Sequence, residues 1–323
     1  MDETAERKAY PSVAVVIAAY NASAFIADAV RSALAQTVSP QVIVVDDAST
    51  DNTAAIAREA GEGSDRLKVL IQQKNAGPSA ARNRAIAATD ATWIALLDAD
   101  DRMAPNRLER LLGYASKNNW DFVADDLLRL TDWANINEAK PVWSAVPFEP
   151  FALDLRRFVE ENLPANTGHG RELGFIKPIM KRRFLTDRGL RYNTDMRLAE
   201  DYDLYARALI AGGKFGLVEA QGYYAFDRPG SLSKQHSAHD LKQLLDTARQ
   251  LESAPDISDE TRAALRDHRR LQHRRWARVH LLEAVRERRW INAMGAFIAP
   301  PGVALDLLSM VLGRFTRGSK SNG

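Results

Sequence analysis

The chain has 323 residues, of which 46% are hydrophobic and 27% are charged, so its composition predicts a packed core and argues against global disorder. It has no cysteine, which excludes disulfides and thiol chemistry, and its net charge of +2 is too small to indicate a nucleic-acid partner. The first residues lack the pattern of a secretory signal, and no apolar run reaches the about 18 residues of a membrane span. We therefore expect a cytoplasmic protein.

The first third of the chain alternates between predicted strands and predicted helices. Apolar runs rich in β-branched residues predict strands at 13–19, 41–47, 67–72 and 92–98. Apolar residues at helical spacing, or capping residues, predict helices between them at 25–34, 49–61 and 77–88. Continuous apolar strands that alternate with helices predict an α/β fold, with a mostly parallel sheet that helices cover on both faces.

Polar side chains follow each of these four strands. They are Tyr20, Asn21, Asp46, Asp47, Asn75, Arg82, Asn83, Asp98, Asp100 and Asp101. The carboxyl ends of strands are where open α/β sheets bind their ligands. Polar residues also flank strands for purely structural reasons, but their recurrence at four strand ends favours a binding site.

The segment LLDADD (96–101) carries the most specific chemistry. Asp98 and Asp100 flank one small residue in a predicted turn, and two carboxylates so close repel unless one is protonated or a cation bridges them. One or two carboxylates together with substrate phosphates are the usual ligands of Mg²⁺. The alternative is that Asp100 or Asp101 only caps the following helix.

Five segments in order carry a family resemblance: VVIAAYN (15–21), VIVVDDASTDNT (42–53), NAGPSAARN (75–83), LLDADD (96–101) and LAEDYDL (198–204). Over about residues 11–235 the chain resembles the bacterial family 2 glycosyltransferases, and is similar to those of exopolysaccharide biosynthesis of the succinoglycan type. The resemblance implies a GT-A fold, with a Rossmann-like nucleotide-binding half and a mixed sheet flanked by helices. The chain departs from the family where Ala18 and Ala19 replace a common Pro-Thr pair.

The resemblance implies a donor site at the strand ends. Tyr20 would stack on the nucleotide base, and Asp47 would accept a hydrogen bond from the imide N–H of uracil, which favours a UDP-sugar. Arg82 would lie near the donor sugar or diphosphate, unless it is a surface arginine on its helix. Asp98 would contact the ribose or a metal-bound water and is also a candidate metal ligand. Asp100 would hold Mg²⁺ or Mn²⁺ against the diphosphate.

The resemblance also implies the residues that act on the acceptor and the leaving group. Asp201 would deprotonate the acceptor hydroxyl in an inverting transfer, with Glu200 as its orienting neighbour or substitute. By position alone, these two acids would equally well cap a helix N-terminus. Arg228, in the loop 223–236, would pair with the diphosphate, unless that loop is an ordinary turn. The remaining implied donor-binding residues are Ala19, Asn21 and Ala99.

The C-terminal part of the chain differs in composition. Residues 261–290 contain ten arginines and three acids, a net charge of +7, and the apolar residues 293–315 follow. A basic helix beside an apolar stretch suits an anionic membrane surface, although a solvated helix packed on the catalytic domain is the alternative. We therefore expect a catalytic domain at 1–240 and a helical region at 241–323 that is peripheral on the inner face of the plasma membrane.

Together these features predict an inverting, metal-dependent transferase that moves a sugar from a nucleotide-sugar to a saccharide acceptor, expected to be lipid-linked, in exopolysaccharide or surface-polysaccharide biosynthesis. The irregular, aromatic residues 131–172 would form the acceptor side. A sugar nucleotidylyltransferase is an alternative, but its glycine-rich phosphate loop is missing after the first predicted strand. A non-catalytic membrane scaffold is the other alternative, although all the acids that catalysis needs are present. No nucleic-acid partner is expected.

Overall fold

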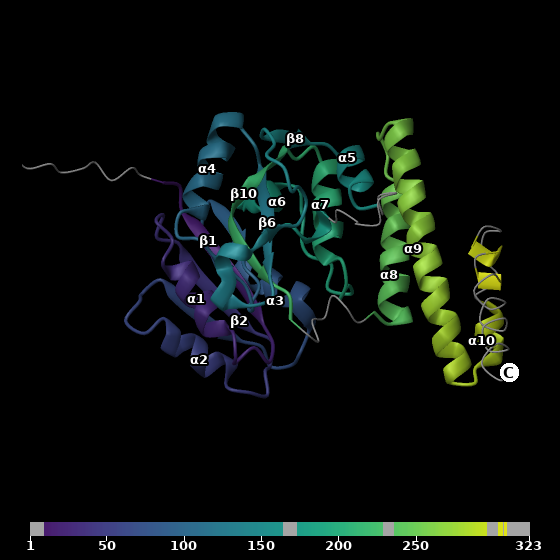
Figure 1. Cartoon of the computed structure of the whole chain (residues 1–323), viewed down its shortest axis with the longest axis horizontal. Helices are drawn as coiled ribbons and strands as arrows, with labels where there is room; N and C mark the ends of the chain where they lie inside the picture. Colours follow the sequence, from purple (N-terminus) through teal and green to yellow (C-terminus); the bar gives the residue numbers. More distant parts are fainter. Residues whose placement is uncertain (1–9, 164–172, 229–235, 296–302, 306, 309–323) are drawn as a thin grey trace, which may run out of the picture. The chain divides into compact units, whose positions relative to one another are not determined.

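The computed structural model describes residues 10–163, 173–228, 236–295, 303–305 and 307–308. The chain divides into two compact units, each of which is described here by itself. The first unit, within residues 1–158 and 171–229, contains the sheet and its covering helices (Figure 1). The second, within residues 159–170 and 230–323, is helical in the described residues.

The first unit is built on a mixed sheet with the strand order β3-β2-β1-β4-β9-β6-β10-β5. Its strands are β1 (Val13–Ala19), β2 (Gln41–Asp46), β3 (Leu67–Ile71), β4 (Trp93–Leu96), β5 (Arg102–Met103), β6 (Phe122–Leu130), β7 (Lys140–Pro141), β8 (Phe151–Leu153), β9 (Ile179–Lys181) and β10 (Phe215–Phe226). The pairs β1–β2, β1–β4 and β2–β3 are parallel, which confirms the predicted arrangement of the first four strands. β9 runs antiparallel to both β4 and β6, so the sheet as a whole is mixed.

Helices in the first unit follow the apolar spacing of the sequence. They are α1 (Ile26–Leu34), α2 (Thr53–Ala60), α3 (Gly77–Ala87), α4 (Arg107–Asn118), α5 (Leu155–Glu160), α6 (Arg182–Asp187) and α7 (Glu200–Ile210), with short 3-10 turns at Trp133–Glu138 and Leu173–Phe175. The buried residues of α1 recur at helical spacing, and they join side chains of β1, β2 and β4 in one core. In the chain, β1, β2 and β3 are each followed by a helix, α1, α2 and α3. The predicted site lies at the edge of the sheet where these strands end.

A fully buried ion pair joins α4 to β6. Arg107 Nη2 lies 2.6 Å from Asp125 Oδ1, and both side chains have no exposed surface. The second Asp125 oxygen accepts a hydrogen bond from the backbone N–H of Gln221 at 2.9 Å. Arg107 Nη2 also donates to the backbone carbonyl of Lys177 at 2.5 Å. This pair therefore ties α4, β6 and β10 to the segment that enters β9.

The second unit contains a helical hairpin of α8 (Ala238–Glu252) and α9 (Asp259–Arg286), followed by α10 (Trp290–Gly295). α8 begins with a capping box between Ser237 and Asp240 and buries Leu241, Leu244 and Leu245. The predicted basic helix forms as α9, and one side of it is packed within this unit. The domain boundary at 240/241 stays a prediction, and α8 begins just before it. Most of the apolar segment 293–315 lies outside the described residues, and no helix in the described parts has the length and apolar character to cross a membrane.

The Arg107–Asp125 pair gives a prediction for stability. Arg107→Met should lower the free energy of unfolding by about 3–5 kcal/mol, because it leaves a buried carboxylate without its counter-charge. Urea unfolding followed by tryptophan fluorescence measures this, since Trp93 and Trp120 are buried in the same unit. The control is Arg183→Met, which breaks an exposed pair with Asp187 and should change stability by less than about 0.5 kcal/mol. Equal effects of the two variants would contradict the prediction.

Candidate active site

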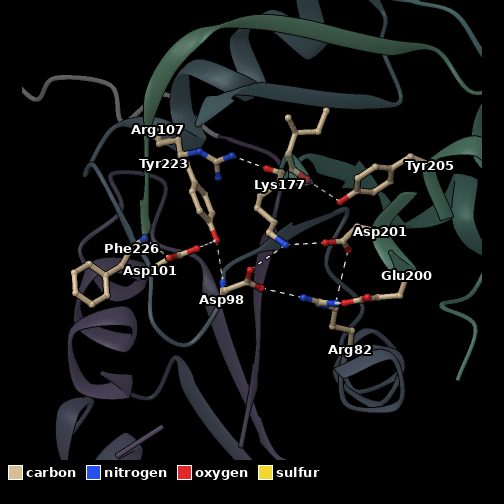
Figure 2. A network of polar contacts seen from close by, with 11 residues as sticks. Arg82, Asp98, Asp101, Arg107, Lys177, Glu200, Asp201, Tyr205, Tyr223 and Phe226 are labelled. Atoms are coloured by element: carbon tan, nitrogen blue, oxygen red, sulfur yellow. Dashed lines mark hydrogen bonds and ion pairs between the residues drawn. The ribbon is translucent and has the colours of Figure 1, made fainter. Parts of the chain in front are cut away.

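Charged side chains from distant parts of the sequence meet at the carboxyl edge of the parallel strands (Figure 2). Arg82 comes from α3, and Asp98 lies two residues after the end of β4. Lys177 lies just before β9, and Glu200 and Asp201 form the first turn of α7. Figure 2 shows the five side chains pointing toward one another, with dashed lines marking their contacts. The structure thus brings four of the predicted residues together and adds one, Lys177.

Arg82 is the first of two buried cations in this cluster. Its Nη1 lies 2.6 Å from Glu200 Oε1 and 3.7 Å from Asp201 Oδ1, and its Nη2 lies 2.9 Å from Asp98 Oδ1. Only 7% of its side chain is exposed, so it is not the surface arginine that the sequence allowed. Arg82 therefore links the strand end to the start of α7.

Lys177 is the second cation, and the sequence analysis missed it. Its Nζ lies 2.9 Å from Asp98 Oδ2 and 2.7 Å from Asp201 Oδ2. Tyr205 Oη donates to the carbonyl of Ile176 at 3.0 Å, and Arg107 donates to the carbonyl of Lys177 itself. Two buried side chains thus fix the backbone that presents this ammonium group. The only sequence signal was a charged residue inside the apolar segment GFIKPIM (174–180).

The opposite charges keep one another ionised. Burial opposes ionisation of Asp98, but the ammonium of Lys177 and the guanidinium of Arg82 outweigh it and lower the pKa of Asp98 to about 2. Burial likewise opposes the charge on Lys177, yet Asp201 and Asp98 raise the pKa of that ammonium. Burial raises the pKa of Glu200, and the opposing effect of Arg82 does not cancel it. The cluster pairs two fixed cations with three carboxylates.

The acids at the start of α7 do not cap it with their side chains. The N-cap residue is Ala199, whose backbone is left-handed with φ 58°, and it makes no side-chain capping bond. Glu200 and Asp201 instead turn toward Arg82 and Lys177. Asp201 Oδ1 is buried and has no hydrogen-bond partner among the described residues. Asp201 Oδ1 thus makes no direct hydrogen bond in that part of the chain but lies 3.7 Å from Arg82 Nη1, while Oδ2 is held by Lys177.

The turn after β4 divides its three acids among different partners. Asp101 Oδ2 accepts from Tyr223 Oη at 2.8 Å, and Oδ1 accepts from the N–H of Phe226 at 2.8 Å. Tyr223 Oη in turn accepts from the N–H of Asp98 at 3.0 Å. Burial, together with the carboxylates of Asp98 and Asp100, raises the pKa of Asp101. Asp101 therefore fastens the turn to β10, and neither it nor Asp100 caps α4, whose N-cap is Asn106.

Asp100 forms an ion pair with Arg228. The sequence analysis assigned both residues to the donor diphosphate. Arg228 Nε lies 2.6 Å from Asp100 Oδ2, and both side chains are partly exposed. Asp100 Oδ1 has no protein partner among the described residues, whereas both oxygens of Asp98 are paired. A divalent ion therefore fits best on Asp100 with oxygens of a bound phosphate, since the described residues offer no group of three protein ligands.

The remaining predicted donor residues lie at the ends of β1 and β2. The side chain of Tyr20 is 48% exposed, so one aromatic ring is open to a partner. Asn21 Oδ1 accepts from the N–H of Thr50 at 2.9 Å, which joins the two strand ends. Asp47 is buried and accepts from the N–H of Ala76 at 2.8 Å and of Gly77 at 2.7 Å. Asp47 Oδ1 also accepts from Gln72 Nε2, so a base could use only the second lone pair of Oδ2.

The last two predicted donor residues, Ala19 and Ala99, have no polar side-chain group. The carbonyl of Ala19 accepts the N–H of Asp47 at 2.8 Å, which fixes the ends of β1 and β2 to each other. Ala99 is buried between Asp98 and Asp100. A small residue there leaves room for the two flanking carboxylates to diverge toward different partners.

Comparisons with known proteins show the family of this chain. Residues 14–168 match the family model described as Glycosyl transferase family 2. The chain is 39% identical over 311 residues to the succinoglycan biosynthesis protein ExoU of Rhizobium meliloti, covering 96% of this chain and 90% of the relative. It is 34% identical to ExoO of the same organism, covering 93% and 84%.

Two solved structures share the fold. The first is Staphylococcus aureus TarS 1-349 in complex with UDP-GlcNAc, with a TM-score of 0.66, 20% identity and coverage of 90% of this chain and 82% of that one. The second is the mannosyltransferase PcManGT from Pyrobaculum calidifontis in complex with GDP-Man and Mn²⁺, with a TM-score of 0.58, 16% identity and coverage of 95% and 81%. These likenesses show the GT-A architecture that the sequence predicts.

The position of Lys177 predicts a pH-dependent effect on stability. The folded-state pKa of Asp98, about 2, is below its unfolded value of about 4, so its ionisation stabilises the fold above pH 4 and this is lost as pH falls toward 2. Lys177→Met removes the attraction that causes the shift. Its destabilisation, measured by urea unfolding, should therefore be largest at neutral pH and should shrink as pH falls toward about 3.

A packing variant provides the control for this effect. Met180 of β9, three residues after Lys177, is fully buried, and Met180→Ala removes only apolar contacts. Its destabilisation should be nearly the same at each pH. If Lys177→Met behaves in the same pH-independent way, the ammonium does not hold Asp98 ionised.

Proposed function

The chain belongs to glycosyl transferase family 2, and from this membership and the site we propose that it transfers a sugar from a nucleotide-sugar to a saccharide acceptor with inversion at the anomeric carbon. One observation carries the proposal: Asp201 Oδ1, which makes no hydrogen bond among the described residues, lies in a cluster where Lys177 and Arg82 hold both Asp201 and Asp98. The names of the relatives support a role in assembling an exopolysaccharide or another surface polysaccharide.

Asp201 acts as the base in the proposed reaction. The acceptor hydroxyl oxygen forms a bond to the anomeric carbon, its proton passes to Asp201 Oδ1, and the bond from that carbon to the diphosphate oxygen breaks on the opposite face. Lys177 holds Asp201 Oδ2 at 2.7 Å, which orients Oδ1 for this step. Glu200 is bonded to Arg82 at 2.6 Å and acts as the neighbour that positions this guanidinium.

The nucleotide end of the donor binds at the ends of β1 and β2 in this proposal. The open ring of Tyr20 stacks on the base, and Asp47 accepts from its imide N–H, which favours uracil and a UDP-sugar. Asp98, already held by both cations, faces the ribose. Arg228 exchanges its contact with Asp100 for the diphosphate oxygens, with which a guanidinium pairs well.

A divalent cation, Mg²⁺ or Mn²⁺, would be held by Asp100 and would neutralise the charge that develops on the diphosphate. Support comes from the free Oδ1 of Asp100 and from the Mn²⁺ in the PcManGT complex. Asp98 was also predicted as a metal ligand, but its pairing with Lys177 and Arg82 favours a role through these cations.

The acceptor and the location are the broadest parts of the proposal. A lipid-linked saccharide suits the role in surface-polysaccharide assembly, and it would place the enzyme in the cytoplasm at the inner face of the membrane. The aromatic residues Trp143, Phe148 and Phe151 pack together, with centroids 4.7 to 5.9 Å apart, in the region proposed for the acceptor side. Family membership argues against the alternative of a nucleotidylyltransferase. The activity assays described next test the alternative of a non-catalytic scaffold.

The assignment of the base gives the central prediction of the function. Asp201→Asn should lower kcat by about 100-fold or more and leave donor affinity nearly unchanged, because it removes a proton acceptor without changing the nucleotide site. Turnover is measured as UDP release with acceptor, and affinity by calorimetry with UDP. Asp187→Asn, at an exposed position of α6, is the control and should keep full activity.

The same assay separates the alternatives. Proton NMR should show a β-linked product from an α-linked donor, and a retained α linkage would overturn the inverting mechanism. Formation of UDP-sugar from UTP would identify a nucleotidylyltransferase instead. If no candidate donor is hydrolysed or transferred by a folded chain, the scaffold alternative stands.

Variants of Asp98 and Asp100 distinguish the role of the metal from that of Lys177 and Arg82. Asp100→Asn should abolish the gain in UDP affinity that Mn²⁺ gives over EDTA, because it removes the proposed ligand. Asp98→Asn should keep this gain while lowering kcat, because it disturbs the bridge to Lys177 and Arg82. Calorimetric titration of UDP with Mn²⁺ or EDTA measures both. An unchanged metal effect in Asp100→Asn would show that the metal binds elsewhere or not at all.

A further inference from the structure

The second unit presents a row of arginines on α9. Five arginines of this helix are exposed: Arg266, Arg270, Arg274, Arg278 and Arg286. The first four follow one another at intervals of four residues. The exposed Leu282 takes the next position, and Arg286 the one after it. Residues four apart in a helix are neighbours on its surface. These five arginines, the arginine row, therefore form a basic strip that winds slowly around the helix and that Leu282 interrupts between Arg278 and Arg286.

The rest of α9 holds the arginine row in place. Leu265 and His268 are buried in the N-terminal half of α9, and Leu281 and Ala284 are buried in its C-terminal half. Ala277, Leu281 and Ala284 pack with Val303 and Leu307 in a small core of this unit. Because these residues occupy the packed sides of α9, the arginines are left on the side that faces solvent.

The arginine row leads directly into exposed apolar residues. Trp290, Ile291 and Met294 of α10 are 61%, 87% and 72% exposed, and we refer to them as the apolar end. Large apolar side chains exposed together at one end of a domain commonly mark a binding surface. Here they follow the basic strip in sequence and belong to the same compact unit.

Acids neutralise only part of this surface. Arg266 lies 3.4 Å from Glu252, and Arg270 lies 3.0 Å from Asp267. Among the described residues, no carboxylate pairs with Arg278 or Arg286. Since residues 261–290 carry a net charge of +7, an excess of positive charge stays on this unit.

We propose that the arginine row and the apolar end together bind the surface of a bilayer that contains anionic phospholipids. The guanidinium groups pair with lipid phosphates, while Trp290 and its apolar neighbours enter the boundary between headgroups and acyl chains. This surface is separate from the transfer chemistry, and it does not depend on the assignment of donor, base or metal. It would supply the membrane contact that a lipid-linked acceptor requires.

The apolar end decides between a membrane and a nucleic acid. A phosphate backbone would also attract the arginine row, and such binding would also weaken with salt. It offers nothing, however, to an exposed Ile291 or Met294, whereas a bilayer interface takes up tryptophan and aliphatic side chains together. The combination of charges and apolar residues therefore favours the lipid surface.

Sedimentation of the full chain with vesicles tests the proposal. The chain should bind vesicles of phosphatidylglycerol mixed with phosphatidylcholine, and bind phosphatidylcholine alone far more weakly. Arg270→Gln, Arg274→Gln and Arg278→Gln together should weaken binding to the mixed vesicles by about 100-fold at low salt, since each arginine contributes a factor of about five. Added salt should reduce wild-type binding but should not abolish the contribution of the apolar end, because salt screens only the charges.

Two further variants separate local from general effects. Trp290→Ser with Ile291→Ser should leave the salt dependence in place but remove the binding that persists at high salt. The control changes three exposed arginines of the other unit, Arg58, Arg183 and Arg188, to glutamine, which lowers net charge equally and should leave vesicle binding unchanged. Circular dichroism confirms that each variant is folded.

Three results would overturn the proposal. One is equal binding of the wild type to both kinds of vesicle. The second is equal loss of binding in the arginine-row variant and in the control variant. The third is tight, salt-sensitive binding of polyuridylic acid by a chain that ignores vesicles at low salt, which would identify a nucleic-acid surface.

Discussion

The buried ammonium group of Lys177 is the interaction on which the rest of the site depends. Asp98, Glu200 and Asp201 would repel one another if they met without cations, because like charges in a poorly hydrated site disfavour joint ionisation. Lys177 lies 2.9 Å from Asp98 and 2.7 Å from Asp201, and Arg82 completes the pairing from the other side. The start of α7 and the end of β4 are thereby linked through these charges.

This arrangement needs a rigid support for the lysine. Arg107 and Tyr205 bind the carbonyls of Lys177 and Ile176, and Arg107 is itself paired with Asp125 where no solvent reaches. Breaking a buried ion pair destabilises a protein more than breaking an exposed one does. The backbone that presents Lys177 is therefore firmly held. The core beneath the sheet and the charges at its edge are in this way parts of one network.

The same kind of charge serves a different purpose in the second unit. In the first unit, each buried cation has carboxylate partners that preserve its charge. On α9, arginines face solvent, and several have weak or no acidic partners among the described residues. Buried pairs fix geometry, whereas exposed unpaired charges attract an external partner over about a Debye length. The division of the chain into two units therefore matches the division that we propose between chemistry and membrane attachment.

The sequence by itself determined the elements that local physics controls. Apolar runs located β1, β2 and β4, because a buried strand needs side chains of that kind on both faces, and they also located β3, whose residues are only partly buried or exposed. The strand-end acids marked the edge at which we propose the donor site. Five ordered motifs fixed the family. The reversal of β9 was not visible in its three residues, because pairing direction depends on neighbours distant in sequence.

Only the tertiary structure decided which charges meet. Lys177 is 24 residues from Asp201, and nothing in GFIKPIM shows that its ammonium reaches a carboxylate. The division of labour in LLDADD was equally hidden: Asp98 pairs with two cations, Asp100 with Arg228, and Asp101 with β10. A sequence pattern records which groups are available, but electrostatic energy depends on distance and burial, and folding alone sets both.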